Sequence, residues 1–247
     1  DHSLIEKDKI NILWVHHFIN QREVKNLSDK LYVEKIDYIV FNSTWNLRKH
    51  LQYFKIPEEK CVVIKNAIEK IEPKNKPKDQ LNLIYHTTPW RGLKILLEIF
   101  KEIKKKEGLK LHVCSSTIIY GQKFHSEYEK KFIDLFEDCK KIENIEFHSY
   151  LTNDKVIKLL KNMHIFSYPS IWPETSCIAA IEAMAAGCEV VTTNLGALVE
   201  TCDKFGTFVN FETNNENLKK NFREKLYKSI DNFWSQNNQK KLVEQTK

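Results

Sequence analysis

The chain has 247 residues, 42% of them hydrophobic and 29% charged, which is the composition of an ordinary globular protein. No apolar run approaches the roughly 20 residues that span a bilayer, and the first residues do not have the pattern of a secretory signal. The formal net charge of +6 is spread along Lys-rich segments such as 101–106, which is typical of solvated helix faces and argues against a nucleic-acid partner.

The six cysteines contain no Cys-x-x-Cys pair, and most of them lie in apolar segments. We therefore expect reduced thiols and a cytoplasmic protein, with peripheral attachment to a membrane as a further expectation. The nine histidines are scattered without the spacing of metal ligands, so we expect no metal site and no cofactor.

In the N-terminal part, strand-like and helix-like segments alternate. Strands are expected at 10–15, 37–41 and 61–64, and helices at 22–35 and after Ser43, whose hydroxyl is suited to cap a helix. The segment 69–80 is rich in Lys, Pro and Glu and is expected to be a linker.

The alternation continues beyond the linker with about six strands. They are expected at 81–85, 110–114, 145–147, 164–168, 189–192 and 207–209. The helices expected between and after them are at 92–107, 125–141, 154–162, 175–186, 197–203 and from about 216. This pattern predicts an α/β protein with two Rossmann-like, doubly wound parallel sheets, divided as 1–72, 73–215 and a C-terminal helical segment 216–247.

The two units are unequal. The first has about three strands, and all six glycines lie in the second, so the first contains no Gly-rich phosphate loop. We expect the N-terminal domain to be incomplete, in keeping with a chain that does not begin with Met.

The most informative stretch runs from Tyr168 to Gly187. It reads as a strand, a Pro-bounded turn, a helix capped by Thr175 or Ser176, and a glycine stop. Glu174 is expected beside the first turn and Glu182 inside the helix, eight residues apart and able to share a face. Either these carboxylates are surface residues that complement the helix dipole, or they bind a ligand. We favour a ligand, because a carboxylate among small apolar residues needs a partner.

Three other segments place polar residues where strands end. Arg91 and Lys94 lie at a strand-to-helix turn, where a cation meets anions that the helix N-terminus favours, unless Arg91 is simply exposed. Gly196 permits close backbone approach, and Glu200 either points into the same crevice or caps a helix. His16 follows the first strand and is either structural or functional.

Together these residues resemble a known family. Pro169-Ser-x-x-Pro-Glu174, Glu182-Ala-Met-Ala-Ala-Gly187 and Gly196-Ala-x-x-Glu200 look like the donor domain of family 4 retaining glycosyltransferases with the GT-B fold. The segments 37–45 and 56–68 look like the late part of that family's N-terminal, acceptor-side domain.

The resemblance implies roles by position. Glu174 would contact the donor sugar with the backbone N–H groups of Thr175, Ser176 and Cys177, and Glu182 would accept hydrogen bonds from the ribose. Arg91 would bind the diphosphate, with Lys94 as a helper. His16 joins Glu174 and Arg91 as a candidate catalytic residue because of its place after the first strand, and not through the resemblance. The remaining donor-binding positions are Tyr150 and Leu151 beside the base, with Gly196 and Glu200. Two positions depart from the family pattern: Cys177 replaces a usual glycine, and His86 stands where many members carry a second cation.

The resemblance therefore implies a hexosyltransferase-type enzyme that moves a sugar from a nucleotide-diphospho-sugar to a glycan or lipid-linked acceptor, with retention and without a metal. The alternatives are a nucleotide-sugar-binding module without catalysis, or an epimerase or phosphorylase on the same fold. The sugar, base, acceptor and oligomeric state do not follow from the sequence. An incomplete N-terminal sheet would favour self-association and leave this chain a poor enzyme by itself.

Overall fold

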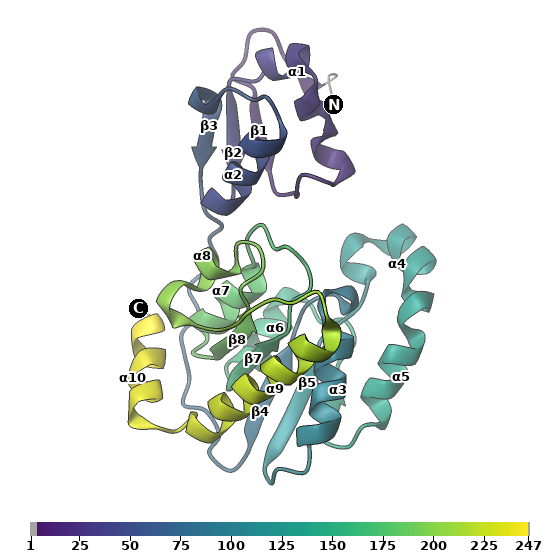
Figure 1. Cartoon of the computed structure of the whole chain (residues 1–247), viewed down its shortest axis with the longest axis vertical. Helices are drawn as coiled ribbons and strands as arrows, with labels where there is room; N and C mark the ends of the chain where they lie inside the picture. Colours follow the sequence, from purple (N-terminus) through teal and green to yellow (C-terminus); the bar gives the residue numbers. More distant parts are fainter. Residues whose placement is uncertain (1–3, 247) are drawn as a thin grey trace. The chain divides into compact units, whose positions relative to one another are not determined.

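The structure is a computed structural model that describes residues 4–246, and its chain forms two units (Figure 1). The N-terminal unit comprises residues up to 67 together with two short segments, 173–178 and 196–201. The C-terminal unit comprises 68–172, 179–195 and the residues from 202 onward. Two segments that are distant in sequence are therefore part of the N-terminal unit.

The N-terminal unit has a three-stranded parallel sheet in the order β1-β2-β3. Its strands are β1 (Ile12–Val15), β2 (Tyr38–Phe41) and β3 (Cys61–Val63), and its main helices are α1 (Lys30–Glu34) and α2 (Thr44–Tyr53). Apolar residues of the strands and helices form one core, including Ile39 and Phe41, which are fully buried. As predicted, Ser43 caps α2, because its side-chain oxygen accepts a hydrogen bond from the backbone of Asn46 at 3.0 Å.

The single helix predicted over 22–35 is wrong. The segment forms a 3-10 helix, Arg22–Ser28, and then the separate helix α1. Asp29 lies between them in an extended conformation, and its carboxylate accepts a hydrogen bond from the Leu31 N–H at 2.9 Å. A short acidic side chain that caps a new helix start interrupts the helix before it.

The C-terminal unit has a six-stranded, wholly parallel sheet in the order β6-β5-β4-β7-β8-β9. Its strands are β4 (Leu81–Tyr85), β5 (Leu109–Val113), β6 (Ile145–Phe147), β7 (Ile165–Tyr168), β8 (Glu189–Thr193) and β9 (Gly206–Val209). The predicted six strands and the doubly wound α/β fold are confirmed. Strands β4 and β7 are fully or almost fully buried, as expected for parallel strands with both faces covered.

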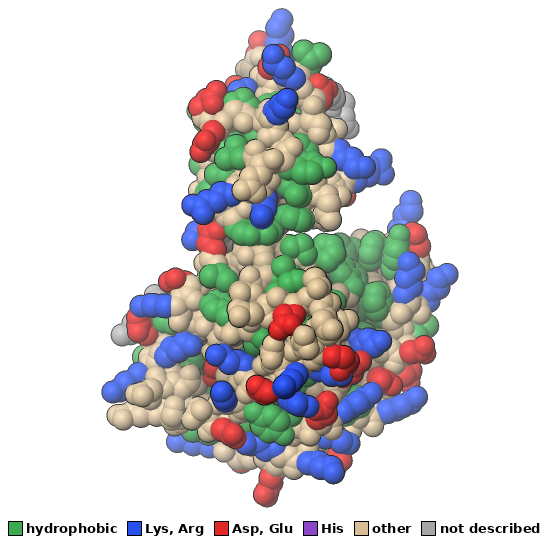
Figure 2. Space-filling model, viewed as in Figure 1, with side chains coloured by type: hydrophobic (Ala, Val, Ile, Leu, Met, Phe, Trp, Pro, Cys, Tyr) green, Lys and Arg blue, Asp and Glu red, His purple; other side chains and the backbone are tan. Residues whose placement is uncertain are grey.

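Helices cover this sheet. They are α3 (Leu93–Ile103), α4 (Gln122–Tyr128), α5 (Ile133–Lys141), α6 (Asn153–Leu160), α7 (Ile178–Ala185), α9 (Asn215–Asn232) and α10 (Gln236–Gln245). The short helix α8 (Leu198–Cys202) belongs mainly to the segment 196–201 of the N-terminal unit. Helices α3 and α9 pack against each other and cross the sheet on one face (Figure 1). On the face that Figure 2 shows, basic and acidic side chains are interspersed, in keeping with a solvated surface.

Two helices predicted as continuous are divided. The segment 125–141 contains a 3-10 turn, Glu129–Phe132, between α4 and α5, and the C-terminal helix breaks before Ser235, which caps α10 by accepting from Asn238 N–H at 3.3 Å. Across the described residues, 4–246, every helix is too short or too polar to cross a membrane.

The motif helix α7 begins at Ile178, later than predicted. Neither Thr175 nor Ser176 occupies its cap position, and Glu174 lies four residues before the helix, so the predicted shared helical face of Glu174 and Glu182 is wrong. The predicted glycine stop is confirmed: Gly187 has φ +75°, and the Cys188 N–H bonds to the Ala183 carbonyl at 2.9 Å.

Candidate functional site

The strand order places a reversal at the centre of the C-terminal sheet. From β4 the chain proceeds through β5 and β6 to one edge and then returns to place β7 on the other side of β4. In open parallel sheets, ligands bind at the carboxyl ends of the two strands that flank such a reversal. The loops that follow β4 and β7, 86–92 and 169–177, are therefore the first place to look for a binding site.

Arg91 ends the loop that follows β4. Its guanidinium donates a hydrogen bond from Nη2 to the Tyr120 hydroxyl at 3.2 Å and lies 5.6 Å from the centre of the Trp172 ring. Stacking on an aromatic face orients a planar cation. The two contacts hold Arg91 at the turn that begins α3, where the sequence predicts an anion-binding cation.

A close backbone contact joins the two loops. Gly92 has φ +127°, and a Cβ there would lie 2.1 Å from the Pro169 carbonyl oxygen. The backbone N–H of Ile171 also donates to the Arg91 carbonyl at 3.3 Å. Only glycine fits at position 92, so this residue allows the loops after β4 and β7 to touch.

His86 does not supply a second cation. Its Nε2 bonds to the Ala179 carbonyl at 3.1 Å, and burial lowers the pKa of His86 to about 4. The imidazole is therefore neutral near pH 7, unlike a Lys or Arg at this position. Lys94 is exposed on the first turn of α3 and lines a pocket of about 490 Å³ with Trp90.

Glu182 is a buried carboxylate of α7 with a specific partner. Only 7% of it is exposed, and its Oε1 accepts a hydrogen bond from the Asn153 side chain at 2.7 Å. Burial raises the pKa of Glu182 above its usual value, and the Asn153 N–H group offsets part of this increase. The sequence indicated that Glu182 needs a partner but did not identify Asn153, the first residue of α6.

The hydrogen bond to Asn153 brings Glu182 next to the segment predicted to border a nucleotide base. Tyr150, 49% exposed, and Leu151 are followed by Thr152, the N-cap residue of α6, and Ser149 before them has φ +54°. Within the C-terminal unit, the predicted residues Glu182, Tyr150 and Leu151 thus belong to one local arrangement, which the Asn153–Glu182 hydrogen bond links.

The segments 173–178 and 196–201 bring further predicted residues together in the N-terminal unit. Glu174 is 4% exposed, and its carbonyl accepts from the Ala197 N–H at 2.7 Å. A Cβ on Gly196, which has φ +70°, would lie 2.5 Å from the Glu174 carbonyl oxygen. Glycine at 196 therefore allows the two segments to pack backbone against backbone.

Thr175 makes three contacts in the same unit. Its hydroxyl donates to the His16 carbonyl at 2.8 Å and accepts from the Asn42 side chain at 3.1 Å, and its carbonyl accepts from the Ser43 hydroxyl at 2.6 Å. These partners explain why Thr175 does not cap α7. The His16 side chain is exposed and its ring lies against the Trp14 ring. Partial desolvation and the neighbouring His17 lower the pKa of His16.

Glu200 caps a helix, although not its own. Its two carboxylate oxygens accept from the N–H groups of Thr44 at 3.0 Å and Trp45 at 2.9 Å, the first two residues of α2, and Lys65 lies 3.4 Å away. Burial by itself would raise the pKa of Glu200, but the two N–H groups lower it below its usual value. Two further predicted residues follow Glu174 in the sequence: Ser176 is half-buried and Cys177 is buried.

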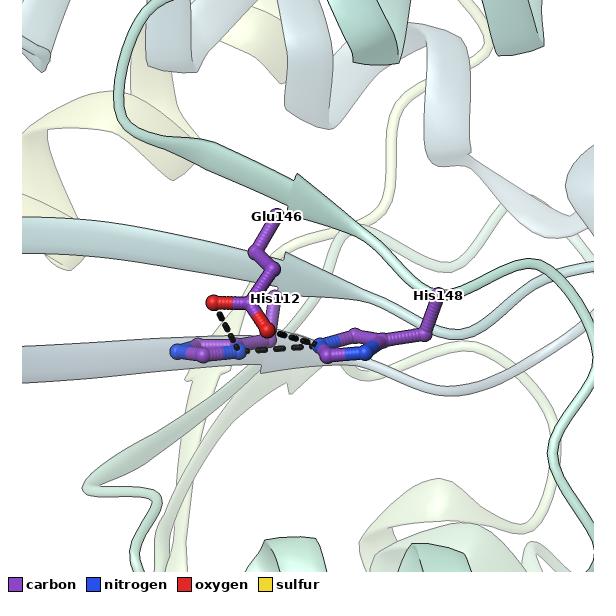
Figure 3. Close-up of side chains that lie close together, drawn as sticks. All are labelled: His112, Glu146 and His148. Atoms are coloured by element: carbon purple, nitrogen blue, oxygen red, sulfur yellow. Dashed lines mark hydrogen bonds and ion pairs between the residues drawn. The ribbon is translucent and has the colours of Figure 1, made fainter.

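One cluster is suited to hold a metal ion. His112 on β5 and Glu146 and His148, on and just after β6, direct their ligand atoms toward one another (Figure 3). The sequence does not predict this cluster, because the parallel pairing of β5 with β6 places His112 beside Glu146 across a long sequence interval. Burial lowers the pKa of His112 to about 4 and also lowers the pKa of His148.

The model of one protein family, glycosyl transferases group 1, matches residues 64–245, well over half of the chain. Among curated proteins, no sequence matches this chain.

Solved structures resemble the chain over nearly its whole length. A glycosyltransferase from Rickettsia africae is 21% identical with a TM-score of 0.59, over 94% of this chain and 68% of that one. Sucrose-phosphate synthase from Thermosynechococcus elongatus is 14% identical with a TM-score of 0.69, over 95% and 62%. Anabaena HepE in complex with UDP-glucose is 14% identical with a TM-score of 0.70, over 96% and 66%. The chain thus spans about two thirds of the length of these structures, and the similarity establishes a GT-B fold.

Proposed function

The chain belongs to the glycosyl transferases group 1 family, and from this premise we propose that it binds a nucleotide-diphospho-sugar and contributes to transfer of the sugar with retention, as family 4 enzymes do. The function is that of a hexosyltransferase acting on a glycan or lipid-linked acceptor. The HepE structure contains UDP-glucose, which supports a nucleotide sugar as the donor.

The observation that carries the proposal is the buried Glu182 carboxylate. A buried carboxylate is costly unless it is hydrogen-bonded, and one of its oxygens is already satisfied by Asn153. The remaining acceptor capacity suits two vicinal hydroxyls, such as those of a ribose, which donate to a carboxylate. The neighbouring Tyr150 and Leu151 then supply an apolar border for the base.

The diphosphate is assigned to the loop that ends with Arg91. The proposed site places a guanidinium and the first N–H groups of α3 beside an anion, and both favour negative charge. As the sugar leaves, negative charge builds on the departing phosphate, so fixed positive groups at this position accelerate the reaction. This arrangement does not require a metal, which is why we propose metal-independent transfer.

For the sugar itself we assign Glu174 and the backbone N–H groups of residues 175–177. Retention without a protein nucleophile requires the acceptor to attack on the face from which the diphosphate departs. In this proposal, the phosphate oxygens that Arg91 stabilises accept the acceptor's proton, so the bond to the acceptor forms as the bond to the diphosphate breaks.

Binding and transfer need separate tests. Isothermal titration with UDP, GDP and ADP, and then with their glucose conjugates, measures donor binding with and without EDTA. One nucleoside diphosphate should bind with an affinity that EDTA does not change. Failure of all three, with the protein folded by circular dichroism, would refute the nucleotide site.

Transfer is tested by incubating the chain with the bound nucleotide sugar and a panel of glycan and lipid-linked acceptors. The anomeric configuration of any product, determined by NMR, should match that of the donor. Inversion would contradict the proposed same-face attack, and binding without turnover would favour the alternative of a binding module.

A further inference from the structure

The cluster of His112, Glu146 and His148 lies at the edge of the C-terminal sheet, on β5, on the outermost strand β6 and just after β6. One nitrogen of each histidine and the two carboxylate oxygens of Glu146 lie close together (Figure 3). His112 Nδ1 lies 3.0 Å from His148 Nε2 and 3.8 Å from Glu146 Oε2, and Glu146 Oε1 lies 3.5 Å from His148 Nε2.

These separations match a metal-binding geometry. Two ligand atoms that each lie about 2.0–2.1 Å from a tetrahedral zinc ion are about 3.3 Å apart. The distance between the two imidazole nitrogens is slightly shorter than this value, and the two distances from these nitrogens to the Glu146 oxygens are slightly longer. Two imidazole nitrogens and one carboxylate oxygen are a donor set that suits zinc and neighbouring first-row divalent metals.

We propose that His112, Glu146 and His148 bind one divalent transition-metal ion of the zinc type, with a water molecule as the fourth ligand. The exposure of the three side chains fits this arrangement. The side chain of His112 is 8% exposed, that of His148 17% and that of Glu146 46%. The histidines are therefore on the buried side of the site, and Glu146 is on the side from which the ion and its water enter.

A lysine side chain contacts the carboxylate of Glu146. Lys110 Nζ lies 3.0 Å from Glu146 Oε2. A carboxylate with one oxygen held by Lys110 still offers the other to a metal. Lys110 also competes for the carboxylate charge, so its removal should strengthen metal binding.

The ion would link two adjacent strands and fix the chain that follows β6. His148 is the last ligand, and Ser149 and Tyr150 come directly after it. The cluster shares no residue with the donor site proposed above, so the two proposals can fail independently.

The test uses the full chain, stripped with EDTA and titrated with ZnCl2 by isothermal calorimetry. One ion per chain should bind, and zinc should raise the Tm. His148→Ala and Glu146→Gln, both near the sheet edge, should weaken zinc binding by about tenfold or more and abolish the rise in Tm. Lys110→Ala should tighten zinc binding severalfold.

His125→Ala is the matched control, because His125 forms a His–carboxylate pair with Glu129 at 3.3 Å without a third ligand. It should leave zinc affinity unchanged. Co²⁺ substitution adds a second readout: the visible spectrum of the bound ion should show nitrogen and oxygen ligation without a thiolate charge-transfer band.

Absence of zinc binding by the folded chain would overturn the proposal and leave a hydrogen-bonded histidine pair. Binding that survives both His148→Ala and Glu146→Gln, or a cobalt spectrum with thiolate ligation, would also overturn it, because the ion would then be held elsewhere, for example by cysteines.

Discussion

Replacement of Glu182 should change nucleotide affinity and protein stability in opposite directions. In the proposed site, the carboxylate accepts hydrogen bonds from the ribose while Asn153 holds it in place. Loss of a charge-assisted hydrogen bond costs about 1.5–3 kcal/mol, so Glu182→Ala should raise the Kd of the bound nucleoside diphosphate ~10- to 150-fold. Glu182→Gln retains a neutral acceptor and should raise the Kd about fivefold.

The effect on stability follows from the raised pKa of Glu182. In the folded chain the carboxyl group keeps its proton to a higher pH than in the unfolded chain. The stability that this provides is fully present below the unfolded pKa and is lost as the pH rises through the folded pKa. At pH 7 the ionised, buried carboxylate therefore costs stability, and Glu182→Gln removes that cost.

Thermal unfolding without nucleotide should accordingly show a higher Tm for Glu182→Gln than for the wild type at pH 7 and nearly equal values at pH 4. Isothermal titration with the preferred nucleoside diphosphate then measures affinity for both variants. A stability cost at a binding site is the trade-off expected where function needs a buried charge.

Glu189→Gln is the matched control. Glu189 is also a buried carboxylate of the C-terminal unit, but it accepts hydrogen bonds from Thr207, Ser229 and Asn238 at 2.7–3.2 Å. This variant should lower the Tm and leave nucleotide affinity unchanged. If Glu182→Gln behaves in the same way as Glu189→Gln, Glu182 is a structural residue and the reasoning is refuted.

Three further outcomes are expected. Arg91→Ala should weaken binding of the diphosphate far more than binding of the plain nucleoside, with a smaller difference at high salt, whereas Arg223→Ala should change neither titration. Glu200→Gln should lower the free energy of unfolding of the N-terminal unit by about 0.5–2 kcal/mol, measured in urea at pH 7. Because the pKa of Glu200 is lowered in the folded chain, the stability advantage of the wild type exists above the unfolded pKa and should disappear as the pH falls through the folded pKa. A difference that persists in acid would contradict the capping role. Gly92→Ala should lower the Tm and weaken diphosphate binding, because its Cβ would strike the Pro169 carbonyl, and a wild-type Tm would show that the loops do not touch.

The sequence by itself determined the parts of this protein that depend on local pattern. The alternation of short apolar strands with amphipathic helices predicted two parallel sheets with three and six strands, and Gly187 marked the end of α7. The isolation of Glu182 among small apolar residues indicated a buried acid in need of a partner. Such features are readable because hydrophobic periodicity and glycine conformation act over a few neighbouring residues.

The tertiary structure decided which distant residues meet. Asn153 pairs with Glu182, Glu200 caps a helix that begins at Thr44, and Thr175 bonds to His16 instead of capping α7. In each case a polar group is satisfied by a partner far along the chain, and local propensity gives way to the requirement that buried donors and acceptors be paired.

The histidine cluster illustrates the same limit most clearly. His112 and Glu146 become neighbours only because β5 and β6 pair in parallel with one particular register, and a shift of one residue would send one of them to the opposite face. Register is set by the packing of the whole sheet. The sequence therefore supplied the chemistry of the three side chains, and only the folded sheet determined that they face one another.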